Sequence, residues 1–342
     1  MNFFITGTAG FIGFHLARRL LMDGNTVTGF DAVTPYYDRG LKRARLRLLS
    51  DFERFVPIEG RLEDLNVLRS SVDQSNAETI VHLAAQPGVR YSIENPREYI
   101  DANLVGSYNL LEVASETRPR HLLMASSSSV YGANEAVPFR ETDRADRPLS
   151  LYAATKASME AMTHALSHLH YLPTTVFRFF TVYGPWGRPD MALFKFVDAI
   201  ERGQPIDVHG EGKPRRDFTY IDDLIEAICR LIPIAPSPEG RVALPSDMDS
   251  LSSEAPFRVV NIGGGRPVSL LEFIDVIEAA LGKQAFRRLV PMQAGDVPLT
   301  FASSDLLEAL TAFKPQTTIE NGVRAFVDWH RTHYRDTRLN PG

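Results

Sequence analysis

The 342-residue sequence contains a single cysteine, Cys229, which excludes a disulfide framework within the chain. This cysteine stands in the apolar segment 224–232, so we expect a buried thiol in a reducing compartment. No apolar run reaches the roughly 20 residues that a helix needs to span a bilayer. A strand pattern at residues 2–5 leaves no room for a signal peptide before it. These absences predict a cytoplasmic protein without a membrane partner.

The sequence also lacks an excess of positive charge, because acidic residues outnumber basic ones and the net charge is −5 at pH 7. A protein that binds nucleic acid needs a basic surface for the phosphates, so we expect no nucleic-acid partner. We also predict no metal site. Apolar residues make up 44% of the chain, which is typical of a globular protein, and the length suits one large α/β domain with a smaller lobe.

Alternating strand and helix patterns run through the first half of the sequence. The strand patterns lie at residues 2–6, 27–30, 55–59, 79–83, 121–125 and 174–180. This alternation predicts an α/β fold with a Rossmann-like, doubly wound parallel sheet. Ligands of such sheets bind beyond the carboxyl ends of the strands, so we expect the residues that follow these strands to form one site.

Proline and glycine become dense after residue 180, which marks a departure from the sheet. We therefore predict a dinucleotide-binding domain at residues 1–180 and a smaller C-terminal α/β lobe at residues 181–216 and 264–342. An apolar helix pattern predicts that residues 217–263 pack back on the first domain. The basic segment 36–50 is predicted to form a loop and a helix with a mostly solvated face.

Three glycines, Gly7, Gly10 and Gly13, follow the first strand pattern and open a helix pattern. Glycine lets the backbone approach a pyrophosphate, and the helix N-terminus attracts its charge. Asp31 ends the second strand pattern, where a carboxylate can hold a ribose 2′-hydroxyl and repels the 2′-phosphate of NADP. We therefore predict NAD as the cofactor. The residues predicted to bind it here are Gly7, Gly10, Phe11, Ile12, Gly13 and Asp31.

Tyr152 and Lys156 lie four residues apart in a segment rich in alanine and threonine. This spacing places both side chains on one face of a helix. An ammonium beside a phenol stabilises the phenolate, so Tyr152 is a candidate general base. The pair alone is weak evidence, because the same spacing occurs on many solvated helices. Whether the pair is catalytic depends on the other residues of the site.

Taken together, these motifs resemble the extended short-chain dehydrogenase/reductase family over almost the whole chain. Within it the sequence resembles the nucleotide-sugar 4-epimerases, in particular those that act on UDP-glucuronate. The matching stretches are residues 7–13, 82–86, 126–132, 152–156, 178–190 and 215–220. The resemblance implies an isomerase with bound NAD and a UDP-sugar substrate. It further implies a homodimer formed through helices at about 96–116 and 152–169.

The resemblance also assigns roles to individual residues. It makes Tyr152 the general base, Lys156 the residue that holds the nicotinamide ribose and lowers the phenol pKa, and Ser127 the donor to the reacting oxygen. Further cofactor residues implied are Leu83, Ala84, Ala85 and Asn103. The substrate residues implied are Ser127, Ser128, Ser129, Arg90, Thr181, Arg188, Phe194, Arg216 and Asp296. Among these, Ser128, Thr181 and Arg188 are candidates to hold a sugar carboxylate, since guanidinium binds carboxylate bidentately.

The serine pair Ser128–Ser129 distinguishes between related reactions. The related sugar dehydratases carry Asp-Glu at these positions and the UDP-glucuronate decarboxylases carry Glu. Hydroxyls cannot readily supply the acid and base that dehydration needs, so this pair favours epimerisation. A UDP-glucuronate decarboxylase, a 4-epimerase of neutral UDP-sugars and a non-catalytic NAD-binding protein are the alternatives. Arg61 departs from the family, which usually has an aspartate near the adenine amine there.

Overall fold

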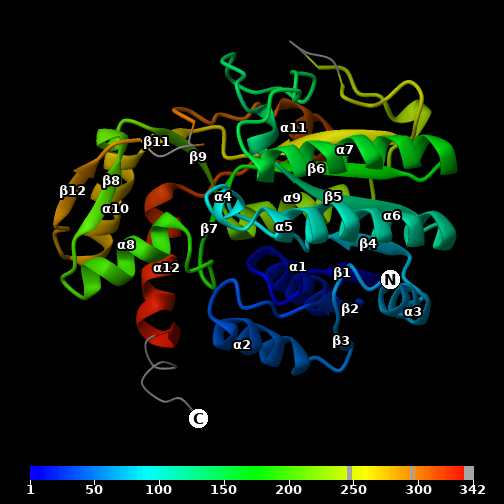
Figure 1. Cartoon of the computed structure of the whole chain (residues 1–342), viewed down its shortest axis with the longest axis horizontal. Helices are drawn as coiled ribbons and strands as arrows, with labels where there is room; N and C mark the ends of the chain where they lie inside the picture. The colour runs from blue at the N-terminus through cyan, green and yellow to red at the C-terminus, as the bar shows by residue number, and fades with distance from the viewer. Residues whose placement is uncertain (245–248, 293–294, 296, 335–342) are drawn as a thin grey trace.

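The computed structural model describes residues 1–244, 249–292, 295 and 297–334 (Figure 1). Its centre is a parallel sheet of seven strands, which confirms the predicted doubly wound fold. In spatial order the strands are β10 (Phe257–Ile262), β6 (Thr174–Phe179), β5 (His121–Ser127), β4 (Thr79–His82), β1 (Asn2–Thr6), β2 (Thr26–Asp31) and β3 (Phe55–Glu59). The order reverses direction between β1 and β4, where such sheets bind ligands.

Helices cover both faces of this sheet because successive strand residues point to opposite sides. Phe3 and Ile5 of β1 join a core that includes α1 (Phe11–Met22), α9 (Ile221–Leu231) and α11 (Asp305–Thr311). Phe4, between them, joins the opposite core, which includes α3 (Leu65–Ser75), α6 (Gly106–Thr117) and α7 (Leu151–His170). Cys229 is half-buried on α9 against the first core.

The segment predicted as one long helix at about 96–116 is divided. It follows the short helix α4 (Tyr91–Glu94) and consists of α5 (Pro96–Tyr99), a π-helical turn at Ile100–Val105 and then α6. A π turn widens the helix locally and is common at functional sites. Asn103 lies in this turn and is fully buried.

A smaller lobe lies beside the sheet, to the left in Figure 1. It contains a sheet of β7 (Thr181–Tyr183), β9 (Arg215–Tyr220) and β11 (Pro267–Ser269), and a parallel pair of β8 (Ile206–His209) and β12 (Arg287–Val290). Its core lies among α8 (Ala192–Glu201), α10 (Leu270–Leu281) and α12 (Ile319–Trp329), which a π turn at His330–Tyr334 follows. The domain boundaries given above stay a prediction.

Among the described residues, the remaining helical elements are one further helix and three short turns. A helix α2 (Arg39–Ser50) follows β2, and 3₁₀ turns occupy Ser128–Tyr131, Gly210–Gly212 and Pro238–Gly240. Within the described part of the chain, no helix is both long enough and apolar enough to cross a bilayer.

Candidate functional site

A cavity of about 270 Å³ opens at the carboxyl ends of β1, β2, β4 and β5, where the strand order reverses. Most of the predicted site residues meet in its wall. These are Gly7, Gly10, Phe11, Ile12, Gly13, Asp31, Leu83, Ala84, Ala85, Ser127, Tyr152, Lys156 and Arg188. The structure thus brings the predicted cofactor turn and the predicted catalytic group to one rim, although the roles themselves stay predictions.

The glycine turn is packed too closely for side chains. A Cβ on Gly13 would lie 2.1 Å from the Gly7 carbonyl oxygen, and a Cβ on Gly7 would lie 2.8 Å from the Ala84 nitrogen. Gly7 also has φ +82°, which favours glycine. Gly10 caps α1 and has no side chain to accept from the first free N–H groups of that helix. This cradle therefore fits a dinucleotide phosphate.

Asp31 lies beside this turn at the end of β2. Its Oδ2 accepts a hydrogen bond from the Ala9 nitrogen at 2.9 Å and its Oδ1 accepts one from the Val33 nitrogen at 2.8 Å. Burial raises the pKa of this carboxyl, while those hydrogen bonds and the nearby Lys42 and Arg45 charges act against the rise. The carboxylate therefore belongs to the wall of the dinucleotide cradle.

The prediction of a mostly solvated basic face on α2 was wrong for its two central cations, because Lys42 and Arg45 are buried. Arg45 donates to the Ala9 carbonyl oxygen at 2.8 Å and, at 2.6 Å, to the carbonyl oxygen of Trp186. Lys42 donates to the Thr34 carbonyl oxygen at 2.9 Å. These carbonyl groups, together with the nearby Asp31 carboxylate, offset part of the cost of burying the two cations.

Tyr152 lies in the first turn of α7, where Ser150 caps the helix by accepting from the Ala153 nitrogen. Burial raises the pKa of the Tyr152 phenol above its usual value, and the hydrogen bond to Ser127 and the charge of Arg188 counteract part of that rise. Both opposing groups stabilise the phenolate, as a general base requires.

Lys156, one turn further along α7, is buried and directed toward the end of β5. Its Nζ donates to the Ala125 carbonyl oxygen at 2.7 Å. Burial lowers the pKa of Lys156 to about 8, and the charge of Glu160 opposes this effect. The lysine is therefore a cation at neutral pH, close to the cavity that it lines.

Ser127 ends β5 and caps the 3₁₀ turn that follows it. Its Oγ accepts from the Ser129 nitrogen at 3.2 Å and lies 3.2 Å from the Ser129 Oγ. Ser128 and Ser129 are half-buried in this turn, next to the cavity wall that Ser127 contributes. The side chains at the end of β5 beside the cavity therefore carry hydroxyls rather than acids.

Arg188 reaches the cavity from the loop between β7 and α8. Its Nε and Nη2 donate to the Asp190 carboxylate at 3.0 and 2.6 Å, and Tyr36 donates to the same carboxylate at 3.1 Å. Burial works against both charges, but the pair raises the pKa of Arg188 and lowers that of Asp190. The guanidinium is therefore a fixed cation at the rim.

Residues 3–242, more than two thirds of the chain, match the model of the NAD dependent epimerase/dehydratase family. The chain belongs to this family. A relative from Rhizobium meliloti (strain 1021), named as a probable UDP-glucuronate 4-epimerase, is 59% identical, and the similarity covers 98% of each chain. The curated relative UDP-glucuronate 4-epimerase 1 of Arabidopsis thaliana is 43% identical over 96% of this chain and 76% of its own.

A solved structure extends the similarity to three dimensions. The UDP-glucuronic acid 4-epimerase of Bacillus cereus, in complex with UDP-glucuronic acid and NAD, superposes with a TM-score of 0.85 and 29% identity. The superposition covers 97% of this chain and 99% of that one. The NAD-dependent family and the glycine cradle described above agree on the cofactor.

Several predicted residues of this epimerase/dehydratase lie outside the main cavity. Thr181 and Phe194 line a smaller neighbouring cavity that Arg188 also borders. Phe194 is 3% exposed and packs against Tyr334 with ring centroids 4.7 Å apart, so most of its surface belongs to the core of the small lobe. Their contact with a substrate stays a prediction.

Asn103 lies behind the cavity wall rather than in it. Its Oδ1 accepts from the Gln86 nitrogen at 2.7 Å, and its Nδ2 donates to the Gln86 carbonyl oxygen at 3.0 Å and to the Thr155 Oγ1 at 3.1 Å. These bonds tie the loop after β4 to α7. Asn103 thus holds this loop in place, and its contact with the cofactor stays a prediction.

The predicted nucleotide residues are more scattered. Arg90 is exposed at the start of α4. Arg216 is half-buried on β9, and its Nη1 donates to the Arg215 carbonyl oxygen at 3.0 Å. Asp296 lies outside the described residues. The structure does not place Arg90 or Arg216 in the wall of the main cavity.

Sequence reasoning missed several residues of the cavity wall. The wall also contains Thr34, Tyr36, Tyr37, Lys42 and Met191. The adjacent tyrosines and the spacing of Lys42 and Arg45 on one side of a helix were available signals. Asp190, which fixes Arg188, stands two residues after it, so that ion pair was open to prediction as well.

Proposed function

We propose that this enzyme interconverts UDP-glucuronate and UDP-galacturonate by inverting the configuration at C4 of the sugar. The observation that carries the proposal is one cavity that joins a dinucleotide cradle, the Tyr152–Ser127 pair and the fixed guanidinium of Arg188. The names of the relatives from Rhizobium meliloti and Bacillus cereus support the same activity.

Tyr152 is the group that moves the proton. As a phenolate it accepts the proton of the C4 hydroxyl, and Ser127 donates a hydrogen bond to the same oxygen as it becomes a carbonyl. NAD supplies a hydride acceptor and, after the flat 4-keto sugar has turned over, a hydride donor for the opposite face. Tyr152 then returns the proton, so the reaction has no net redox change.

Arg188 provides the cation for the sugar carboxylate. The Asp190 bond engages its Nε and Nη2, and a guanidinium has five N–H donors, so its other edge can bind a second carboxylate. This contact matters because the 4-keto intermediate is a β-keto acid that loses CO₂ when its carboxylate bond is perpendicular to the ketone plane. A carboxylate that is held in another orientation is not lost as CO₂.

The decisive experiment is incubation of the purified protein with UDP-glucuronate, without added NAD, with the products followed by NMR. We expect UDP-galacturonate, because a cofactor that returns to its starting state needs no replacement. Release of CO₂ with a UDP-pentose would identify a decarboxylase instead. A parallel incubation with UDP-glucose measures how strictly the enzyme requires a carboxylate, and faster turnover of UDP-glucose would favour a neutral-sugar epimerase.

The nucleotide, the assembly and the compartment complete the proposal. Arg216 and Asp296 are proposed to hold the diphosphate and the nucleoside of the substrate, and Arg90 is a further candidate for this contact.

A homodimer is proposed through α6 and α7, where Tyr108 and Leu169 are 47% and 70% exposed. Light scattering that gives the mass of one chain would contradict the dimer. The low cysteine content supports a cytoplasmic, reducing compartment.

A further inference from the structure

Three neighbouring residues at the end of β5 are each bound by α7. Tyr152, Lys156 and Glu160 stand one turn apart on this helix, so their side chains share the face toward the sheet. Residues 125–127 of β5 lie opposite them. The pairs are Lys156 Nζ with the Ala125 carbonyl oxygen at 2.7 Å, Ser126 Oγ with Glu160 Oε1 at 2.5 Å, and Tyr152 with Ser127.

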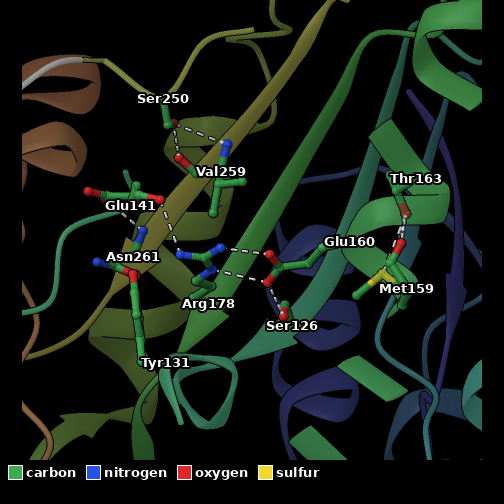
Figure 2. A network of polar contacts seen from close by, with 10 residues as sticks. All are labelled: Ser126, Tyr131, Glu141, Met159, Glu160, Thr163, Arg178, Ser250, Val259 and Asn261. Atoms are coloured by element: carbon green, nitrogen blue, oxygen red, sulfur yellow. Dashed lines mark hydrogen bonds and ion pairs between the residues drawn. The ribbon is translucent and has the colours of Figure 1, made fainter. Parts of the chain in front are cut away.

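Glu160 is anchored a second time, to β6. Its Oε1 accepts from the Arg178 Nε at 3.1 Å and its Oε2 accepts from the Arg178 Nη2 at 2.7 Å (Figure 2). Both side chains are almost fully buried, at 6% and 10% exposure. A buried bidentate ion pair has a strictly defined geometry, because any displacement leaves an uncompensated charge in a medium of low dielectric.

Arg178 is itself held by other elements. Its Nη1 donates to the Glu141 carbonyl oxygen at 3.2 Å, and its guanidinium lies 4.7 Å from the centroid of the Tyr131 ring. Tyr131 in turn donates to the Asn261 Oδ1 on β10 at 2.7 Å (Figure 2). The carboxylate of Glu160 is therefore fixed relative to three strands of the sheet, whereas its own backbone belongs to the helix that carries Tyr152.

We propose that Glu160 is a positioning residue for catalysis, which sets the distance between α7 and the end of β5 and thereby keeps Ser127 against Tyr152. It does not touch the cavity, so it acts only through Ser126 and its neighbours on α7. The inference rests on the proposed function for the role of Tyr152. The buried pair would otherwise be only a stabilising element of the fold.

The charge of Glu160 also bears on Lys156. The groups that face Lys156 are Tyr152 and Glu160 on its own helix and His82 on β4, with Arg178 of β6 behind Glu160. Burial lowers the pKa of His82 to about 3, so this histidine is neutral at working pH. Glu160 is therefore the anion that opposes the loss of the Lys156 proton.

The test uses Glu160→Gln in the full-length holoenzyme. Glutamine keeps the shape and one acceptor for Ser126 but removes the charge that holds Arg178 and Lys156. We expect kcat for UDP-glucuronate to fall about tenfold with KM nearly unchanged, since a misplaced catalytic group slows the chemical step. We also expect the alkaline limb of the kcat profile to move to lower pH by about one unit, because the Lys156 ammonium loses its anion.

A matched control is Asp249→Asn. Asp249 and Arg258 form another buried bidentate pair, with N–O distances of 3.0 and 2.8 Å, on β10 and the segment before it. Neither residue lines the cavity. We expect this variant to lose stability as Glu160→Gln does, while kcat per folded molecule and its pH profile stay as in the wild type. A wild-type kcat and pH profile in Glu160→Gln would overturn the proposal.

Two further measurements keep the outcome decisive. The phenol of Tyr152 can be titrated by tyrosinate absorbance, as the difference between each protein and its Tyr152→Phe counterpart, and we expect Glu160→Gln to raise this pKa. This readout needs no substrate, so it tests Glu160 even if the wild type fails to convert UDP-glucuronate, which would refute the proposed function alone.

If Glu160→Gln does not fold, Ser126→Ala removes the hydrogen bond that links Glu160 to β5. An unchanged kcat and Tyr152 titration in that variant would refute the positioning role.

Discussion

The electrostatic surroundings of Tyr152 come from different parts of the chain. Ser127 arrives from β5 and Arg188 from the loop after β7, and both lower a phenol pKa that burial raises. A motif such as Tyr152 with Lys156 is visible in sequence because it is local. The electrostatic balance at the phenol is not visible in sequence, because it depends on which distant charges the fold brings near.

Replacing Tyr152 by phenylalanine removes the proton acceptor and little else. We expect this variant to bind UDP-glucuronate with nearly wild-type affinity but to lose interconversion, by about 10³-fold or more, since general-base catalysis contributes that order of rate. Calorimetric titration and NMR product analysis measure the two quantities. Retained turnover would remove Tyr152 from the role of base.

Arg188 is expected to discriminate between charged and neutral sugars. We predict that Arg188→Ala raises KM for UDP-glucuronate far more than KM for UDP-glucose, by about tenfold to 100-fold, because a charge-assisted bidentate contact is lost. Asp190→Asn serves as the control, since it keeps the cation and loosens only its anchor. An equal loss with both sugars would place the carboxylate contact elsewhere.

At the scale of elements, α2 shows where sequence reasoning was insufficient. The basic pattern of residues 36–50 favours a solvated helix, and several residues of α2 are exposed as this pattern predicts. Arg45 is buried because the carbonyl oxygens of Trp186 and Gly187, more than a hundred positions away, accept from it at 2.6 and 3.2 Å. Nothing within the helix itself indicates those partners.

The same residue connects the glycine turn to the loop between β7 and α8, because Arg45 also donates to Ala9 in that turn. We expect Arg45→Met to lower the free energy of unfolding by about 2–4 kcal/mol, since several buried carbonyl groups lose their donor. It should also reduce the NAD retained after purification. Chemical denaturation and quantification of the extracted cofactor check both effects, and undiminished NAD content would contradict the connection.

The glycine turn and the catalytic helix, by contrast, were open to prediction. Each depends on a short stretch whose residue types have one compatible geometry, such as Gly13 against the Gly7 carbonyl oxygen. Asn103 shows the limit of that approach. Its position behind the site follows from the π turn at Ile100–Val105, a feature that periodicity alone does not reveal.

At the scale of the whole molecule, buried neutral histidines link stability to pH. Burial lowers the pKa of His15 and His121 to about 4 and that of His82 to about 3. In the unfolded chain a histidine titrates near its model value of 6.5. Below that pH the unfolded state binds more protons than the folded state, so stability is fully present above pH 6.5 and falls as the pH decreases toward 4.

We therefore predict a lower free energy of unfolding at pH 5 than at pH 7, by roughly 1–2 kcal/mol per buried histidine. Asp217 acts in the opposite direction, because burial raises its carboxyl pKa to about 6 and the folded state then holds its proton more tightly. Urea denaturation at the two pH values measures the balance. Equal stability at both would show that the histidines do not outweigh Asp217 and would contradict the prediction.

Two of the passages of the chain between the central sheet and the small lobe have almost no linker. A single buried residue, Phe180, separates β6 from β7, and β9 ends at Tyr220 where α9 begins at Ile221. A hinge needs a few residues that can absorb backbone rotation, and these two junctions offer none to spare. We therefore expect little movement at these two junctions during the proposed reaction. The rotation that presents the other face of the sugar would then be made by the substrate rather than by the two parts of the protein.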